Sequence, residues 1–145
     1  MLQILQWAAE PADPPPYARL LHGRNVLMLQ GIVDHYIPPM IANSASLSLA
    51  LDLAGAALDG TIPDIPDQLS LVPLLPFSGG RAVAYPVVGA TVGVVAQHPA
   101  DGIEDGHEVV FQTDGPKHQI RCLLLGLSAG EVRVVAPSAV EAPCD

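Results

Sequence analysis

Asp34 and His107 are the two side chains in this sequence whose types and settings best suit acid–base chemistry. Asp34 lies three residues after Gly31, where the apolar run "NVLMLQGI" ends. His107 lies in "DGIEDGHEVV", an acidic loop with glycines that leads into an apolar segment. An imidazole can act as a general base when a carboxylate holds its other ring nitrogen. His107 could act in this way only with a carboxylate within hydrogen-bonding distance of its ring.

Each of the two residues also has a simpler interpretation. Asp34 could serve only to cap the helix that follows, and Pro38 makes this sterically reasonable. The spacing alone does not decide whether Asp34 belongs to a functional site or serves as a helix cap. Taken alone, His107 fits a surface histidine in an acidic turn.

The remaining histidines offer alternatives to His107 as the base. His98 and His118 are the two candidates, and helical spacing predicts that His118 shares a solvated polar face with Lys117 and Arg121. His35 is adjacent to Asp34 and could line the mouth of the same site.

Metal and cofactor chemistry finds little support in the motifs. The stretch "DGIEDG" superficially resembles the start of a calcium-binding loop. Ile103 occupies a ligand position, however, and Gln112 stands where a bidentate glutamate is needed, so calcium binding is not expected. Cys122 and Cys144 have no metal-ligand spacing and no disulfide-framework pattern. We expect neither a metal nor a cofactor.

The element that must position Asp34 is the apolar run before it. Residues 25–32 are almost continuously apolar and are bounded by turn residues, which is typical of a strand buried on both faces in a parallel sheet. We expect this strand to be central in the sheet. Open α/β folds gather catalytic groups at the carboxyl ends of such strands, so Asp34 becomes a site candidate.

Other segments supply the remaining layers of an α/β fold. Periodicity and the placement of glycine and proline predict helices in the segments 1–10, 17–21, 40–54 and 114–129. β-branched and aromatic residues predict strands in the segments 82–88, 91–97, 108–112 and 132–135. Residues 59–80 are proline-rich and without a period, so we expect an irregular loop there.

Composition limits the classes of function. A chain of 145 residues that is 50% hydrophobic fits a single unit, residues 1–145, or one piece of a larger domain. Six basic against fifteen acidic residues give a net charge of −9, which repels nucleic acid. Only 14% of residues are charged and the mean hydropathy is +0.37, so we expect part of the surface to be covered by something else in the natural setting.

Targeting signals are absent from the residues at hand. The start "MLQILQWAAE" lacks a secretory pattern, and the longest uncharged window, residues 82–100, is interrupted by prolines and glycines. We expect a soluble chain with no transmembrane span. The compartment stays open, since an export signal could be encoded upstream.

Two motifs together resemble the α/β-hydrolase family. "LMLQGIVDHYIPP" resembles the strand and turn that carry the acid of the Ser-Asp-His triad, with Gly31, Asp34, Ile37 and Pro38 at the pattern positions. "DGHEVVFQ" resembles the final histidine loop, with His107 as the base, and "AAEPADPPPYAR" is similar to a loop before the acid strand of bacterial esterases. The acid precedes the histidine, as in that family, and the resemblance implies that Asp34 and His107 lie within hydrogen-bonding distance of each other. The resemblance implies the C-terminal part of an α/β-hydrolase sheet with flanking helices, incomplete by itself.

The chain departs from that family at the nucleophile. No G-x-S-x-G elbow occurs in it, and the nearest imitation, "FSGG" at Ser78, lacks the leading glycine. The resemblance therefore implies the C-terminal segment of an esterase- or lipase-like serine hydrolase that supplies the acid and base and is inactive alone. Its implied partners are a small ester or acyl substrate and either a missing N-terminal portion or a second copy. The alternative is a non-catalytic structural or binding module derived from the fold.

Overall fold

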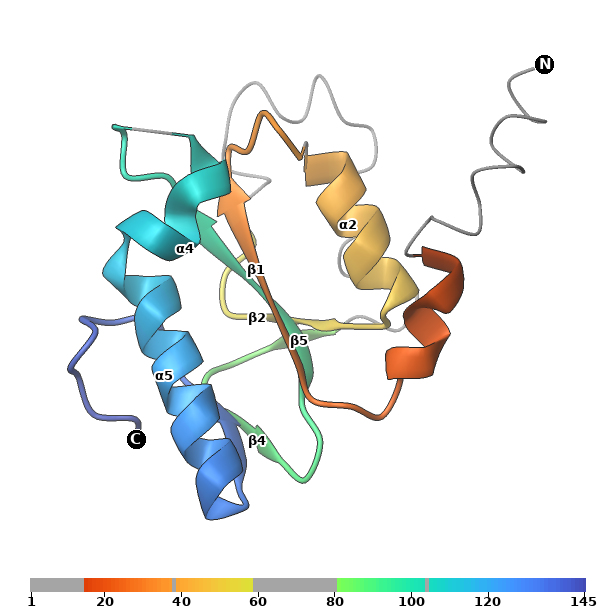
Figure 1. The fold of residues 1–145 in the computed structure, drawn as a ribbon, viewed down its shortest axis with the longest axis vertical. Helices are drawn as coiled ribbons and strands as arrows, with labels where there is room; N and C mark the ends of the chain where they lie inside the picture. The colour runs from red at the N-terminus through yellow and green to blue at the C-terminus, as the bar shows by residue number, and fades with distance from the viewer. Residues whose placement is uncertain (1–14, 38, 59–80, 104) are drawn as a thin grey trace.

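A computed structural model of the chain describes residues 15–37, 39–58, 81–103 and 105–145 (Figure 1). In chain order the elements are η2 (Pro15–Leu21), β1 (Val26–Ile32), α2 (Pro39–Ser48), β2 (Asp52–Ala54), β3 (Ala82–Val83), β4 (Val87–Gly89), β5 (Gly93–Pro99), η5 (Gly106–Glu108), α4 (Val109–Gln112), α5 (Asp114–Ala129) and β6 (Val132–Val134). The architecture is α/β, with a four-stranded parallel sheet flanked by helices and a small antiparallel sheet. The expected fold class is confirmed.

The parallel sheet has the strand order β1-β5-β2-β3. β1 and β5 pair along their whole length, from Val26 opposite Gly93 to Ile32 opposite Pro99. Because the two strands end together, the loops that follow them leave from the same edge of the sheet. This pairing brings the turn after β1 close to the loop before α4, although the two are far apart in the sequence (Figure 1).

β5 forms the centre of the core. Val94, Val95 and Ala96 are all at most 1% exposed, and their side chains alternate between the two faces of the sheet. Val94 belongs to a cluster with Val132 and Val134 that Leu123 of α5 packs against. Val95 belongs to a second cluster on the other face, toward α2. α5 and α2 thus lie on either side of the β1–β5 pair (Figure 1).

The position of β1 in the sheet differs from the prediction. β1 is a parallel strand as expected, but in the described part of the chain it is the outermost strand, with β5 as its single neighbour. A strand that is apolar on both faces is expected to have both faces covered by helices. The same pattern does not indicate whether the strand has one or two hydrogen-bonded neighbours in the sheet. The expectation of a central strand is therefore wrong for the described residues.

Two further predictions need correction. The helix expected over residues 40–54 ends at Ser48, and the chain returns as β2, where Leu53 is 3% exposed. The strand expected over residues 108–112 is instead the helical turns η5 and α4. Val109 is 2% exposed and Phe111 is 74% exposed, whereas a half-buried strand would place both on one face.

Most of the other described elements agree with the prediction. α5 spans Asp114–Ala129 and ends at Gly130, whose φ of 81° is the left-handed conformation that a glycine C-cap adopts. β5 begins in the predicted segment 91–97 and continues to Pro99, and β6 pairs with β4 as a small edge strand. The single strand expected over residues 82–88 is instead two strands, β3 and β4, which belong to different sheets. The expected helix in residues 1–10 and loop in residues 59–80 lie outside the described residues. In the described chain, no helix is long and apolar enough to cross a membrane.

The C-terminal tail is fastened to one face of α5. His118 is 2% exposed, and its ring nitrogens lie 3.1–3.2 Å from the carbonyl oxygens of Ala136, Ala142 and Pro143. Cys122, one turn further along, forms a disulfide with Cys144. The expectation that His118 lies on a solvated face is wrong, because the tail packs over it. The sequence pattern did not predict the disulfide either.

Replacing Cys144 with serine should destabilise the protein under oxidising conditions. The disulfide closes a loop between residues 22 positions apart, and chain entropy gives such a cross-link a stabilising effect of about 3 kcal/mol. Urea unfolding of the wild type and of Cys144→Ser checks this. A dithiol reductant should lower the wild-type midpoint to that of the variant and leave the variant unchanged, whereas equal midpoints without reductant would contradict the prediction.

Candidate functional site

Two glycines bring the ends of the candidate site together. A Cβ atom placed on Gly31 of β1 would lie 1.8 Å from the carbonyl oxygen of Gly106, and one placed on Gly106 would lie 2.5 Å from the carbonyl oxygen of Val33. The backbone N–H of Gly106 donates to that Val33 oxygen over 2.7 Å. The turn after β1 and the loop before α4 therefore touch backbone to backbone, which explains why the apolar run stops on a glycine.

Asp34 uses its two carboxylate oxygens differently. Oδ1 accepts hydrogen bonds from the backbone N–H groups of Tyr36 and Ile37, each over 2.8 Å. Oδ2 lies 3.0 Å from Nδ1 of His107, which is 73 positions away in the sequence. Asp34 thus caps its own turn, before α2 begins at Pro39, and also contacts His107. The expected proximity of the carboxylate and the imidazole is present in the structure.

The contact with Asp34 defines how the imidazole is oriented. A carboxylate only accepts hydrogen bonds, so Nδ1 of His107 donates and Nε2 is the free acceptor when the ring is neutral. In the part of the chain that the structure describes, Nε2 of His107 has no hydrogen-bond partner. The ring of Tyr36 lies 5.1 Å from that of His107, and the His107 side chain is 37% exposed. An imidazole held in this way can accept a proton from a third group.

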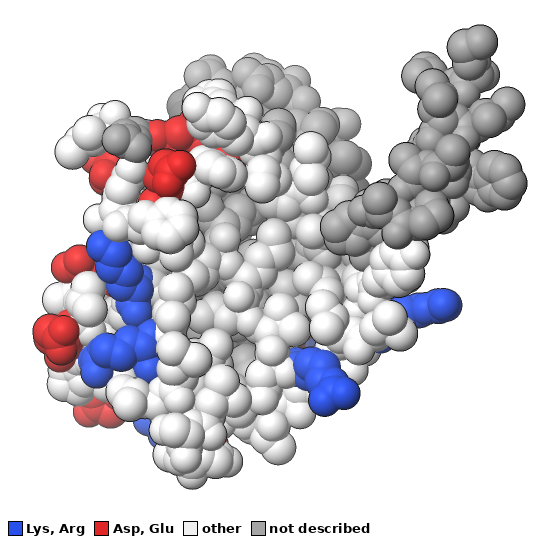
Figure 2. Space-filling view, viewed as in Figure 1, with Lys and Arg blue, Asp and Glu red and all other residues white. Residues whose placement is uncertain are grey.

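Electrostatics favour the charged form of His107. The hydrogen bond to Asp34 raises the pKa of His107 above its ordinary value of 6.5, against an opposing effect of burial, and the negative charges of Asp34, Glu108 and Asp105 add to the rise. Acidic side chains gather over the loops around α4, at the upper left of Figure 2. Because the folded-state pKa is raised, the pair contributes stability below pH 6.5 that is lost as the pH rises through the raised value.

A second histidine–aspartate pair ties the same two loops together. The side chain of Asp105 accepts from the backbone N–H of His107 over 2.9 Å and from that of His35 over 3.0 Å. It also forms an ion pair with Nδ1 of His35. Although partial burial acts in the opposite direction, these hydrogen bonds lower the pKa of Asp105. Its contribution to stability is therefore present above pH 3.8 and is lost as the pH falls through the lowered value.

Replacing Asp105 with alanine should loosen the loop that carries His107. Losing the cap of η5 should cost about 1 kcal/mol of folding free energy, and the amide protons of His35 and His107 should exchange faster with solvent. The pKa of His107 should also fall, because one neighbouring negative charge is gone. Hydrogen exchange and an NMR titration measure both effects.

Asp101 provides the matched control for this variant. Its carboxylate accepts from the backbone N–H of Ile103 in the same loop, over 2.8 Å. Asp101→Ala should leave the exchange rate of the His107 amide unchanged. Equal acceleration in both variants would mean that Asp105 acts only through general loop stability.

No described serine completes a triad with His107. Ser46, Ser48 and Ser128 donate their hydroxyl groups to backbone carbonyls of their own helices, α2 and α5. Ser70 and Ser78 lie outside the described residues. In the ranges that the structure does describe, no hydrogen bond joins a serine to Nε2 of His107.

The alternative bases lie away from Asp34. His98 is 3% exposed and its Nε2 lies 2.9 Å from Oε1 of Gln119, and His118 holds the C-terminal tail. Sequence reasoning missed the pairing of His35 with Asp105. The signal was present in "VDHY" and "EDGH", which each place an aspartate within two residues of a histidine.

One described group, His118 with Cys122 and Cys144, has metal-binding residue types within 4.8 Å of one another. The disulfide between the two cysteines occupies the sulfur atoms, so this group is no metal centre in the present form.

Comparisons of the chain with protein-family models, with curated proteins and with solved structures found no match.

Proposed function

We propose that Asp34 and His107 are the acid and base of a Ser-Asp-His triad, in the C-terminal segment of an α/β-hydrolase that cleaves esters or related acyl compounds. The serine nucleophile comes from a polypeptide segment outside this chain. In the complete enzyme His107 takes the serine proton through Nε2, while Asp34 holds the Nδ1 proton and stabilises the imidazolium that forms.

The observation that carries this proposal is the 3.0 Å contact between Oδ2 of Asp34 and Nδ1 of His107. A surface histidine in an acidic turn would need no partner 73 positions away, and a simple cap would use only Oδ1. Both residues follow neighbouring parallel strands at their carboxyl ends, the edge where α/β folds place catalytic groups. Asp34 holds Nδ1, which leaves Nε2 on the other side of the ring available to accept a proton, as a general base requires.

The outer edge of β1 is consistent with a strand from the segment that supplies the serine. In the described chain β1 pairs with one strand, β5, yet its last three residues are buried. An unpaired edge presents backbone N–H and C=O groups to any strand that can align with it. A preceding strand seated there would extend the sheet beside the turn that carries Asp34, which is the side from which a nucleophile could approach.

The surroundings of the site support an apolar acyl substrate. Tyr36 and Phe111, in the segments that carry Asp34 and His107, are 76% and 74% exposed. Ile103, in the loop before η5, is 85% exposed. Large apolar side chains exposed in one region mark a surface that binds something apolar. The acidic side chains near the site make an anionic substrate less suitable.

Labelling with a serine-reactive fluorophosphonate probe tests the proposal. The longer polypeptide encoded in frame upstream of Met1 should contain the nucleophile in a G-x-S-x-G context, and it should be labelled at that serine. This chain alone should stay unlabelled. His107→Ala in the longer polypeptide should abolish most of the labelling rate, and His22→Ala, at an exposed histidine in the segment after η2, should not.

The same experiment separates the enzyme from a binding module. Labelling of this chain by itself would contradict the claim that the nucleophile lies outside it. A longer polypeptide that carries no reactive serine, or one whose labelling rate is independent of His107, would favour the non-catalytic module.

A further inference from the structure

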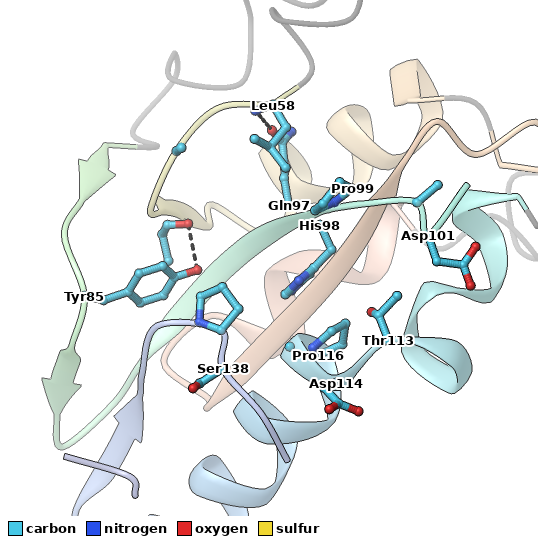
Figure 3. A pocket seen from close by; sticks show the side chains of 15 residues that line it. Leu58, Tyr85, Gln97, His98, Pro99, Asp101, Thr113, Asp114, Pro116 and Ser138 are labelled. Carbon is cyan, nitrogen blue, oxygen red and sulfur yellow. Dashed lines mark hydrogen bonds between the residues drawn. The ribbon is translucent and has the colours of Figure 1, made fainter. Parts of the chain in front are cut away.

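A cavity lies at the carboxyl ends of β5 and β2, on the face of the sheet that α5 covers. Its volume is about 610 Å³, within the size range of small-molecule sites. Its walls come from the ends of the strands, the first turn of α5 and the start of the C-terminal tail (Figure 3). Neither Asp34 nor His107 lines it, so the cavity is separate from the proposed catalytic pair.

His98 lines this cavity, and its hydrogen bond to Gln119 determines which ring nitrogen carries the proton. Nε2 of the side-chain amide of Gln119 donates to the carbonyl oxygen of Val135 over 2.7 Å, which leaves Oε1 facing His98. Nε2 of His98 lies 2.9 Å from that Oε1 and must therefore carry a proton. Burial lowers the pKa of His98, against a smaller opposing effect of the bond to Gln119, so the ring is neutral at pH 7.

The other ring nitrogen of His98 is an unused acceptor. Among the described residues, no hydrogen bond reaches Nδ1, although the side chain is only 3% exposed. Fully enclosed side-chain polar atoms in the described chain all have partners, so Nδ1 keeps contact with open space. Gly115 lines the same cavity, and a Cβ atom there would lie 3.5 Å from Nδ1. In Figure 3 the ring of His98 points from β5 into the space beside Pro116.

Other polar groups in the walls are largely engaged. Tyr85 donates its hydroxyl to the carbonyl oxygen of Ala54, and Oε1 of Gln97 accepts from the N–H of Leu58 (Figure 3). No lysine or arginine is among the described lining residues, whereas Asp101 and Asp114 are. The cavity therefore offers acceptors and negative charge to a ligand, with apolar walls between them.

We propose that this cavity binds a small, uncharged, largely apolar molecule through one O–H or N–H group that donates to Nδ1 of His98. Anions are disfavoured, because the lone pair of Nδ1 repels them and the described lining holds no lysine or arginine. A ligand without a donor leaves Nδ1 desolvated and unpaired, which weakens its binding.

Phenol and anisole are matched probes, because anisole keeps the ring and the oxygen and lacks the donor. ¹⁵N NMR of the histidine side chains should place the His98 proton on Nε2, and phenol should move the Nδ1 signal upfield, toward the position of a hydrogen-bonded nitrogen. Anisole should bind about tenfold more weakly, the difference expected for one hydrogen bond. Equal binding of the two probes, absence of phenol binding at millimolar concentration, or a proton on Nδ1 of His98 would overturn the proposal.

Two variants distinguish the contribution of the Nδ1 acceptor of His98 from the contribution of the open volume of the cavity. His98→Phe keeps a ring and removes the acceptor, so the preference for phenol over anisole should vanish. Ala56→Phe places a large side chain at an exposed position of the lining and should block both probes while the Nε2 proton of His98 persists. Retained preference in His98→Phe, or unchanged phenol affinity in Ala56→Phe, would place the binding elsewhere. Either result leaves the proposal for Asp34 and His107 untouched, since neither residue lines this cavity.

Discussion

An Asp34→Asn variant of the complete enzyme should lose about four orders of magnitude in kcat/KM, the loss seen when the acid of a Ser-His-Asp triad becomes an amide. The asparagine can present an N–H group to Nδ1 of His107, which favours the tautomer with its proton on Nε2. That tautomer cannot take the proton of the serine. The imidazolium that forms during the reaction also loses its counter-charge.

The pH profile distinguishes the loss of the Asp34 carboxylate from a general loss of folded protein. Since Asp34 raises the pKa of His107 above 6.5, the acidic limb of the kcat/KM profile should lie above pH 6.5 in the wild type. In Asp34→Asn the limb should move to lower pH. Asp52→Asn is the control, because Asp52 has a similarly covered side chain and pairs with Arg81 over 2.9 Å at another part of the sheet. An equal loss of activity in both variants would contradict the proposed role of Asp34.

Gly31→Ala should disrupt the site without touching either of its side chains. The added Cβ atom would fall 1.8 Å from the carbonyl oxygen of Gly106, so the turn after β1 and the loop before α4 must separate. We expect a loss of about 3 kcal/mol in the free energy of unfolding, at the upper end of the usual range for overpacking. The activity of the complete enzyme should fall about 100-fold or more, because a displacement of 1 Å in catalytic groups has that effect.

Gly93→Ala is the matched control for this change. Gly93 begins β5, the strand paired with β1, and a Cβ atom there would meet its nearest neighbour, a side-chain carbon of Leu51, at 3.5 Å. That distance is an ordinary van der Waals contact, so the variant should remain folded and keep the contact between Asp34 and His107. NMR signals of His107 report the contact in both variants. If Gly31→Ala preserved it, the close approach of the two glycines would not be what positions the site.

Features determined by nearby residues were predictable from the sequence. α5 was predicted because Pro116 near its start, the helical spacing of its leucines and Gly130 after its end are local signals. The turn around Asp34 was predictable for the same reason, and the resemblance of two short motifs linked it to His107. Their contact could be expected because parallel neighbouring strands end at one edge.

Features determined by distant contacts were not predictable. β1 lies outermost in the described sheet because strand order depends on pairings that its own residues do not encode. The segment after His107 is helical despite its β-branched residues, where η5 and α4 contact β1, a strand far away in the sequence. His118 is buried because Cys144 returns to Cys122 and brings the tail over it. The acceptor on His98 likewise depends on Gln119 and Val135, which no local pattern connects to it.

The most direct measurement is the protonation of His107 in this chain by ¹⁵N and ¹H NMR, for the wild type and Asp34→Asn. The account predicts that the wild-type ring titrates above pH 6.5, that its neutral form carries the proton on Nδ1, and that the variant titrates at lower pH. A wild-type His107 that titrates at or below its ordinary value, or whose neutral form carries the proton on Nε2, would contradict the account.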